Sequence, residues 1–347
     1  MISLRDLTAA LPKVACEFRL SKQLPDTAVT QERPYSTPIF LLAPGRCYSS
    51  VVCAMLGQHP ELYGLPETQL LVRDTMQEWW DSFGEGIHSH GLVRSVAEIV
   101  YGFQSVNTAR RAREWLWQQR NLPTHVILSK LSALVFPLRI VEKTPMVTYR
   151  PEHMRRILNQ FPDARFIHLV RNPISSGESL IEFFHERGPR GDARKIEERL
   201  RNVESIFFRM YDTTTHPPSL DPAENWFIRQ FEVIEFLRAV PEQQQMRIRG
   251  EDLMSDPNTV LRPLCEWLGI RSDTAALEEM KHPERSPFAS FGPPNARHGG
   301  DPKFFRQPKF RPGKPKICPL DNPLPWRADG CRLKTHVQEL ARSFGYR

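Results

Sequence analysis

The stretch that decides the fold runs from Pro38 to Glu67 and reads PIFLLAPGRCYSSVVCAMLGQHPELYGLPE. Its first apolar run, Ile39–Leu42, has the length and composition of a buried strand. The chain then turns at Pro44-Gly45 and continues as an apolar helix that ends near Gly57. A strand, a short loop and a helix in this order predict an α/β protein. Such a unit binds phosphate at the helix N-terminus, where free N–H groups and the positive end of the helix dipole lie.

The loop of this stretch carries one cation and two hydroxyls. Arg46 supplies a fixed positive charge, and Ser49 and Ser50 supply O–H donors. The glycine spacing and the lysine of a Walker A loop are absent, which excludes that class of nucleotide loop. On this segment alone, an ordinary turn whose serines cap the helix explains the residues as well as a phosphate site does.

A second segment, RFIHLVRNPISSGESL at 165–180, repeats this arrangement. A predicted strand over 165–170 delivers Arg171 at its carboxyl end, and Asn172-Pro173 turns the chain into a helix. Ser179 on that helix is eight positions after Arg171, so that both side chains reach one phosphate across the turn. Two phosphate sites at one edge of a sheet suit a nucleotide that carries phosphates at both ends.

Strands alternate with helices along the chain, which predicts a mostly parallel sheet flanked by helices. We expect further strands at 138–141 and 245–249, and helices at 151–160, 173–186, 193–211, 223–239 and 259–268. The predicted organisation is an N-terminal arm over 1–37 and one α/β domain over 38–347, with a helical excursion beside the sheet at 68–125 and a Pro-rich basic loop at 283–326.

The composition of the 347 residues, 40% hydrophobic and 25% charged, is that of a soluble globular protein. No apolar run reaches membrane-spanning length, and the N-terminus lacks the hydrophobic core of a signal peptide, so we expect a cytoplasmic protein. The six cysteines include no C-x-x-C pair, which favours free thiols and argues against a zinc site. Cys47 is better explained as a small residue in a turn than as a nucleophile.

The net charge of +7 is unevenly distributed. From Lys281 to Arg347 there are 14 Lys and Arg against 5 Asp and Glu, a net of +9, which leaves −2 for the rest of the chain. A basic segment of this kind suits nucleic acid, an anionic small molecule or an acidic protein. Because no zinc-finger or RNP-type motif is present, we expect one of the last two and no nucleic acid.

With these residues in view, the chain resembles the sulfotransferases that use 3′-phosphoadenosine 5′-phosphosulfate (PAPS). The loop that follows Gly45, Arg46-Cys47-Tyr48-Ser49-Ser50, stands where that family has its 5′-phosphosulfate loop. Arg171 and Ser179 reproduce its 3′-phosphate motif, and Glu251–Ile270 is similar to its E-D-L…P…L-G segment. The resemblance implies a P-loop-like three-layer α/β fold with a central, mostly parallel sheet, PAPS as donor, 3′-phosphoadenosine 5′-phosphate (PAP) as product and no metal.

Three further segments resemble one branch of the family, the tyrosylprotein sulfotransferases and the sulfotransferase domains of modular polyketide synthases. HPELYGLPETQLL implies that Glu67 is the catalytic base, and VEKTP places Lys143 as the helper that bridges the transferring group and the leaving oxygen. GPPNARHGGDPKF is similar to the glycine-rich C-terminal loop of the polyketide-type domains, which closes over the nucleotide; it carries Gly299, Gly300 and Arg297, the last a candidate for the 3′-phosphate.

The mechanism that the resemblance implies is an in-line displacement at sulfur. Arg46 and Lys143 stabilise the leaving side, and Glu67 takes the proton of the attacking hydroxyl. His185 is the strongest alternative base; His153 is another, and His168 is expected in the core because it lies mid-strand. The acceptor is either a hydroxyacyl chain on a carrier protein, whose acidic surface would suit the basic segment, or a free lipid or natural-product alcohol.

Two other readings stay open. A kinase-like phosphotransferase would depend on Mg²⁺ and a Walker lysine. A non-catalytic nucleotide-binding protein is suggested by Cys47 and Tyr48, which replace the family's serine and glycine. If the position of Tyr48 requires a positive φ, the tyrosine is strained there.

Overall fold

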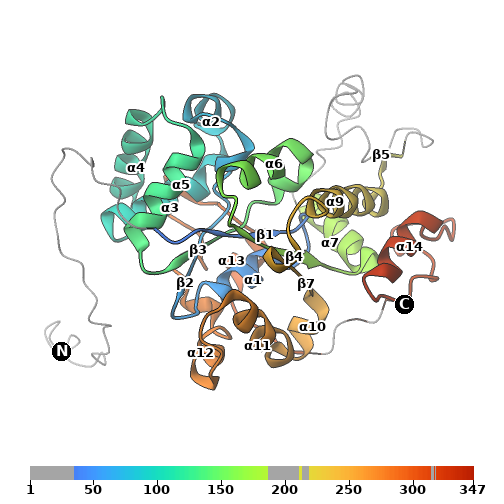
Figure 1. The fold of residues 1–347 in the computed structure, drawn as a ribbon. Coiled ribbons are helices and arrows are strands. Elements are labelled where there is room, and N and C mark those ends of the chain that lie inside the picture. The colour runs from blue at the N-terminus through green and yellow to red at the C-terminus, as the bar shows by residue number, and fades with distance from the viewer. Residues whose placement is uncertain (1–34, 187–210, 213–218, 314–315, 317) are drawn as a thin grey trace, which may run out of the picture. The chain divides into compact units, whose positions relative to one another are not determined.

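The computed structural model describes residues 35–186, 211–212, 219–313, 316 and 318–347, without the side chains of 184–186, 211, 212 and 219. All of these residues belong to one compact unit, Pro34–Arg347 (Figure 1). The predicted arm over 1–37, except for its last three residues, and the predicted helix over 193–211, except for its last residue, lie outside the described part.

Five parallel strands form the central sheet in the order β2-β3-β1-β4-β7. Their bounds are β1 Ile39–Leu42, β2 Leu62–Gly64, β3 Arg139–Glu142, β4 Arg165–Val170 and β7 Gln245–Arg249. Strand β1 is central, with Ile39 opposite Val141 on one side and Arg165 on the other. The predicted strands are confirmed, with β3 one residue later than expected, while β2 was missed because three residues carry no periodicity.

Thirteen α-helices are described: α1 Ser49–Leu56, α2 Met76–Phe83, α3 His90–Tyr101, α4 Val106–Gln118, α5 Thr124–Val135, α6 Pro151–Gln160, α7 Pro173–Glu186, α9 Pro222–Leu237, α10 Gly250–Ser255, α11 Pro257–Leu268, α12 Thr274–Glu279, α13 Pro302–Arg306 and α14 Thr335–Ser343. A short antiparallel pair, β5 Tyr211–Asp212 and β6 Ser219–Leu220, is separate from the main sheet. The segment predicted as a helical excursion contains α2, α3 and α4. None of the helices in the described ranges is long and apolar enough to cross a membrane.

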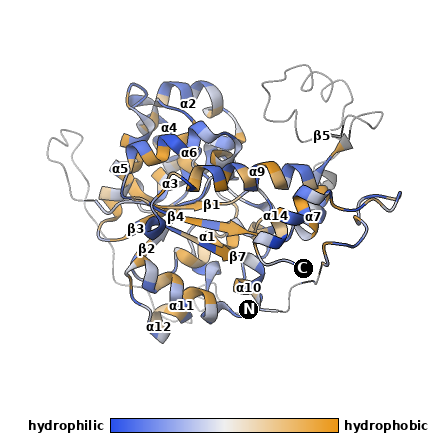
Figure 2. Ribbon diagram, turned by 45° about the vertical axis from the view of Figure 1, so that its right-hand side comes forward, coloured by the Kyte–Doolittle hydropathy of each residue, from blue (hydrophilic) through white to orange (hydrophobic). Residues whose placement is uncertain are grey.

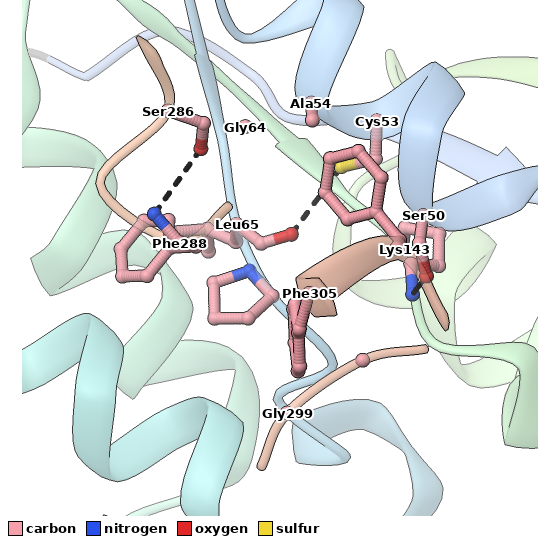
Figure 3. A pocket seen from close by; sticks show the side chains of 13 residues that line it. Ser50, Cys53, Ala54, Gly64, Leu65, Lys143, Ser286, Phe288, Gly299 and Phe305 are labelled. Atoms are coloured by element: carbon pink, nitrogen blue, oxygen red, sulfur yellow. Dashed lines mark hydrogen bonds between the residues drawn. The ribbon is translucent and has the colours of Figure 1, made fainter. Parts of the chain in front are cut away.

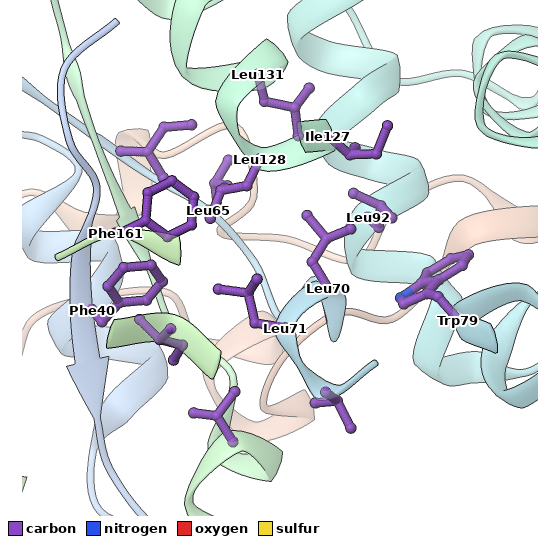
Figure 4. Packing of buried hydrophobic residues seen from close by; sticks show 14 of the residues in the cluster. Phe40, Leu65, Leu70, Leu71, Trp79, Leu92, Ile127, Leu128, Leu131 and Phe161 are labelled. Carbon is purple, nitrogen blue, oxygen red and sulfur yellow. The ribbon is translucent and has the colours of Figure 1, made fainter. Parts of the chain in front are cut away.

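The sheet separates two apolar cores, which gives the three layers. Phe40 and Leu42 face one core with residues of α2 to α6, part of which is shown in Figure 4. Ile39 and Leu41 face the other core with residues of α1, α10 and α11, on the opposite side of the sheet (Figure 1). All four residues of β1 are at most 1% exposed, so the strand is apolar throughout because both of its faces are buried. The central strands are accordingly hydrophobic, and the outer surface of α2 is hydrophilic (Figure 2). The predicted α/β fold with a parallel sheet is confirmed.

A third apolar cluster joins the C-terminal segment to the sheet. Val170 and Trp226 pack there with Val337 of α14 and with Phe344. Helix α14 was not predicted, because the proline-rich sequence before it suggested an irregular loop to the end of the chain. The apolar spacing of Val337, Leu340, Ala341 and Phe344 is the signal that was available.

Several helices begin at an aspartate whose side chain accepts backbone N–H groups of the first turn. Asp221 caps α9, Asp273 caps α12 and Asp301 caps α13. Two of these caps also face an arginine: Asp273 pairs with Arg271 at 2.8 Å, and Asp301 pairs with Arg46 at 3.1 Å. Asp273 and Asp301 therefore make the same two kinds of contact, a helix cap and an ion pair with an arginine, at different places in the fold.

We expect the buried His168 to make the fold sensitive to acid. Burial lowers the pKa of this ring to about 3, so it stays neutral in the folded chain while the unfolded ring takes up a proton below about pH 6.5. Stability is therefore lost as the pH falls from 6.5 toward 3, at up to about 1.4 kcal/mol per pH unit for this ring. Urea unfolding at pH 7 and 5 should show a shallower loss for His168→Gln than for the wild type or for His336→Gln, a half-exposed control. Parallel losses in all three proteins would contradict this.

Candidate functional site

The predicted site residues meet at the carboxyl edge of the sheet. Arg46 follows β1, Glu67 follows β2, Lys143 follows β3 and Arg171 follows β4. Because the strands are parallel, their carboxyl ends lie together, where α/β proteins bind ligands. Arg46, Glu67 and Arg171 line one cavity of about 390 Å³, together with Gly45, Tyr48, Ser49 and Ser50 of the first loop.

Arg46 is held at the wall of this cavity by three groups. Its Nε–H donates to Ser179 Oγ at 3.1 Å, and its Nη1 lies 3.1 Å from Oδ1 of Asp301. The guanidinium also lies over the ring of Phe183, 5.0 Å from its centroid. With 11% of its side chain exposed, Arg46 presents a fixed, partly desolvated positive charge to the cavity.

Arg171 supports the same loop from the other side. Its Nη1 donates to the carbonyl of Arg46 at 2.9 Å, and its Nε donates to Ser175 Oγ at 2.9 Å. The predicted pair Arg171 and Ser179 therefore both contact Arg46. Arg171 bonds its backbone carbonyl, and Ser179 bonds its guanidinium.

Tyr48 has a positive φ, with φ 63° and ψ 8°, which is the backbone conformation expected to strain a tyrosine. The ring lies 4.2 Å from the Arg171 guanidinium and packs against Gly250 at the start of α10. A Cβ at position 250 would stand 2.4 Å from a ring carbon, so only a glycine leaves room for the tyrosine. The cation–π contact and the burial of the ring offset the strain of the backbone.

Lys143 connects the loop to the predicted base. Its Nζ donates to Glu67 Oε1 at 2.6 Å. It also donates to Ser50 Oγ at 3.2 Å (Figure 3). The lysine side chain is 2% exposed, while 25% of the Glu67 side chain is exposed toward the cavity. A cation thus lies between a hydroxyl of the helix N-terminus and a carboxylate. A smaller cavity of about 20 Å³, room for about one water, adjoins Lys143 and Ser50.

The glycine-rich segment after α12 packs onto this group. The N–H of Glu67 donates to the carbonyl of Gly299 at 2.8 Å, and the N–H of Asp301 donates to Ser50 Oγ at 3.2 Å. Gly299 and Gly300 line both cavities. Segment 299–301 therefore forms one wall of the site.

Other predicted residues lie elsewhere. Arg297 is exposed, with its guanidinium 4.8 Å from the Phe291 ring centroid, and does not line the 390 Å³ cavity. Cys47 is buried with its Sγ 4.0 Å from Ser176 Oγ, and burial raises the pKa of the thiol to about 12, which agrees with a small residue in a turn. His185 is in the last turn of α7, and its side chain is not among those described.

The remaining candidate bases are core residues, as expected for His168. Its Nε2 bonds Gln230 Oε1 at 2.6 Å, and His153 Nδ1 bonds the carbonyl of Met146 at 3.2 Å. Burial lowers the pKa of His153 to about 4. Neither ring lines the cavity. The described cysteines are free, as predicted, and no group of three or more His, Cys, Asp or Glu in the described part of the chain could hold a metal ion.

Several cavity residues escaped sequence reasoning. They include Gln69, Ile87, His88, Met146, Tyr149, Leu180, Phe183, Asn225, Arg229, His298 and Asp301. Asp301 had a signal, because it follows Gly299-Gly300 directly, but Arg229 looked like one more charge on a predicted helix. Arg229 is 3% exposed and donates to the carbonyl of Tyr149 at 2.8 Å.

The charges of the site favour an anion. The cations Arg46, Lys143, Arg171 and Arg229 outnumber the carboxylates of Glu67 and Asp301 among the groups described above. Together with the N-terminus of α1, they form a positive, partly desolvated surface beside the two accessible carboxylates. The arrangement can bind a phosphate or sulfate and place a general base against it.

The C-terminal segment supports the turn that carries Arg171. Glu251 accepts the backbone N–H of Asn172 at 2.8 Å through Oε1 and the hydroxyl of Tyr346 at 2.8 Å through Oε2. The side chain of Asn172 donates to the carbonyl of Cys318 at 2.9 Å. The end of the chain thus fixes the geometry of the second anion motif.

We expect Gly91→Ala to disturb the site from behind. A Cβ at position 91, in the first turn of α3, would stand 1.9 Å from the carbonyl oxygen of Glu67, so the helix or Glu67 must move. Overpacking of this kind costs about 1–3 kcal/mol. Urea unfolding should show that loss for Gly91→Ala and little change for Gly86→Ala, whose added methyl meets nothing closer than 3.6 Å. Equal stability of the two variants would contradict the close approach.

Comparison with known proteins agrees with the fold. A family model described as the sulfotransferase family matches residues 38–274. The chain is similar to the solved sulfotransferase domain from the curacin biosynthetic pathway, with 21% identity and a TM-score of 0.69 over 90% of this chain and 99% of that chain. It is also similar to the sulfotransferase domain from the Synechococcus PCC 7002 olefin synthase, with 22% identity and a TM-score of 0.65 over 91% and 98% of the chains. None of the curated proteins compared with the chain matches it.

Proposed function

Because the chain belongs to the sulfotransferase family, we propose that it transfers the sulfuryl group of PAPS to the hydroxyl of an acceptor. The family and the fold support sulfuryl transfer. The identity of the donor, the acceptor and the roles of single residues are our proposal, argued from the cavity.

The proposal places the 5′-phosphosulfate of the donor at the N-terminus of α1. Ser49 and Ser50 supply hydroxyls there, and the backbone N–H groups of the helix face the anion. Arg171 and Ser179, one strand away, take the 3′-phosphate. For this Arg171 exchanges its bond to the Arg46 carbonyl for one to the phosphate, which is a stronger acceptor, while Ser179, which accepts from Arg46 Nε–H, donates its own O–H to the phosphate.

Sulfuryl transfer needs a base on the attacking oxygen and positive charge on the leaving oxygen. Glu67 is the proposed base, because its carboxylate is exposed to the cavity. Lys143 lies beside it, bonded at once to Glu67 and to Ser50, which suits a group that bridges the transferring sulfuryl and the leaving oxygen. Arg46 adds a fixed charge that donates no proton. His185 stays the alternative base.

The acceptor is proposed to enter past the apolar residues of the cavity. Ile87, Met146, Leu180 and Phe183 are among its lining, and Ile87 is 41% exposed. Such a wall suits an alcohol with a hydrocarbon chain. A hydroxyacyl chain on a carrier protein and a free lipid or natural-product alcohol both meet this description. For a carrier, the basic segment after Lys281 is the proposed docking surface.

The observation that carries the proposal is the position of Lys143 Nζ, 3.2 Å from a hydroxyl of the anion loop and 2.6 Å from the Glu67 carboxylate. This contact is polar, so the packing of an apolar core does not explain it. It joins the two groups that a sulfuryl transfer must bring together.

Calorimetric titration with PAP in the presence of EDTA tests the nucleotide class. We expect binding in the micromolar range for the wild type and for Arg238→Ala, an arginine paired with Glu235 at the surface end of α9. Arg171→Ala should weaken binding by about 100-fold, because one charge-assisted phosphate contact is lost at a partly buried site. Absence of binding to the wild type would refute the proposal.

A further inference from the structure

Asp301 places a carboxylate inside a site built for anions. The residue lines the large cavity, and 25% of its side chain is exposed. Its Oδ1 lies 3.1 Å from Arg46 Nη1 and accepts the N–H of Lys303 at 3.1 Å. Its own N–H donates to Ser50 Oγ at 3.2 Å. Cap, ion pair and backbone bond together fix the position of the negative charge.

Structural needs do not require that charge. An asparagine caps a helix as well as an aspartate does, and its amide oxygen can still accept from an arginine. The carboxylate differs from the amide in its charge, which pairs with the Arg46 guanidinium and also repels any anion that binds against Arg46 and Ser50. A repulsive group inside a binding site serves to reject one ligand in favour of another.

The ligands that this charge separates are a sulfuryl group and a phosphoryl group. The two have the same tetrahedral shape and the same number of terminal oxygens. At pH 7 the sulfuryl end of PAPS carries one negative charge, whereas a terminal phosphoryl group, with a second pKa near 6, carries close to two. Steric complementarity cannot distinguish the two groups, because their shapes are the same, but a nearby fixed negative charge can.

We infer that Asp301 is a specificity-determining residue, which makes the donor site prefer a nucleotide that ends in a sulfuryl group over the same nucleotide ending in a phosphoryl group. The inference rests on the proposed function, since it places the donor's terminal group against Arg46 and Ser50. Of the two carboxylates described at the cavity, Glu67 is paired with the buried Lys143, while Asp301 faces the guanidinium that receives the anion. One additional like charge at a distance of a few ångströms, in a partly solvated site, corresponds to about a tenfold difference in affinity.

The test compares two nucleotides that differ only in the terminal group: PAPS and adenosine 3′-phosphate 5′-diphosphate. Dissociation constants are measured by calorimetry in EDTA at pH 7.5 for the wild type, for Asp301→Asn and for Asp273→Asn. The last is a matched control, because Asp273 also caps a helix and pairs with an arginine, but outside the cavity. Thermal unfolding of the three proteins verifies that the caps are preserved.

We expect the preference for PAPS to fall about tenfold in Asp301→Asn, through tighter binding of the diphosphate, and to stay unchanged in Asp273→Asn. At pH 5.5 the terminal phosphoryl group is mostly a monoanion, so the preference of the wild type should shrink toward that of Asp301→Asn.

An unchanged preference in Asp301→Asn would overturn the inference and leave Asp301 as a helix cap that orients Arg46. The proposed function would stand in that case, because PAPS still binds. If the wild type binds neither nucleotide, nor PAP, the proposed function fails and the inference fails with it. The two failures are thus distinguishable from the same titrations.

Discussion

Glu67→Gln is expected to lower kcat by about 10²–10⁴ while PAP affinity and the KM for the acceptor stay unchanged. The amide keeps the volume of the carboxylate and can still accept from Lys143 Nζ, which lies 2.6 Å from Oε1. What it loses is the ability to take the proton of the attacking hydroxyl. The loss therefore appears in the chemical step alone.

The measurement is transfer of radiolabelled sulfate from PAPS to an alcohol that a screen with the wild-type protein has identified. Glu114→Gln is the matched control, because Glu114 pairs with Arg110 on the outer surface of α4. Turnover of Glu67→Gln at the wild-type rate would refute Glu67 as the base. His185→Gln would then be the variant to test.

Arg46→Ala is expected to lower kcat by about 10²–10³, the usual effect of removing one group that stabilises the charge of a transition state. The mutation also frees Ser179 and Asp301, which hold the guanidinium at 3.1 Å each, so PAP binding should weaken as well. Arg46→Lys should lie between wild type and alanine. A lysine keeps the charge but loses the fork that contacts both residues at once.

Turnover and PAP titration of these two variants, with Arg110→Ala as a surface control, separate the charge of Arg46 from its geometry. Equal losses in Arg46→Lys and Arg46→Ala would show that the fork matters more than the charge. Wild-type turnover in Arg46→Ala would leave Lys143 as the stabilising cation and contradict the role proposed for Arg46.

Local pattern was sufficient for much of the fold. Strands β1, β4 and β7 have the bounds that their apolar runs predict, and α6 begins at Pro151, where proline fits the first turn. The pattern was insufficient for β2, which is too short to show a period. Helix α14 has an apolar stripe but was missed because that stripe follows a proline-rich stretch. Hydrophobic periodicity and secondary-structure propensity depend only on residues that are close in sequence, whereas β2 and α14 also depend on contacts with residues that are distant in sequence.

The residues of the candidate site likewise fall into those that the sequence identified and those that only the structure revealed. The sequence identified Arg46 and Arg171 because each follows a predicted strand, and it identified Lys143 and Glu67 through the segments that resemble the family. It did not identify Asp301 as a partner of Arg46, since the two are far apart in sequence and meet only where the glycine-rich segment packs on the loop.

The sequence by itself thus determined the family, the parallel sheet and the positions at which the chain leaves it with a cation or a hydroxyl. These depend on residue type and spacing over a few turns, which the sequence states directly. Only the tertiary structure decided which side chains meet: Lys143 with Glu67, Arg171 with the Arg46 carbonyl, and Tyr48 with Gly250. Such contacts depend on strand order and on segments that return from far along the chain, because contacts between distant residues form only once the sheet has assembled.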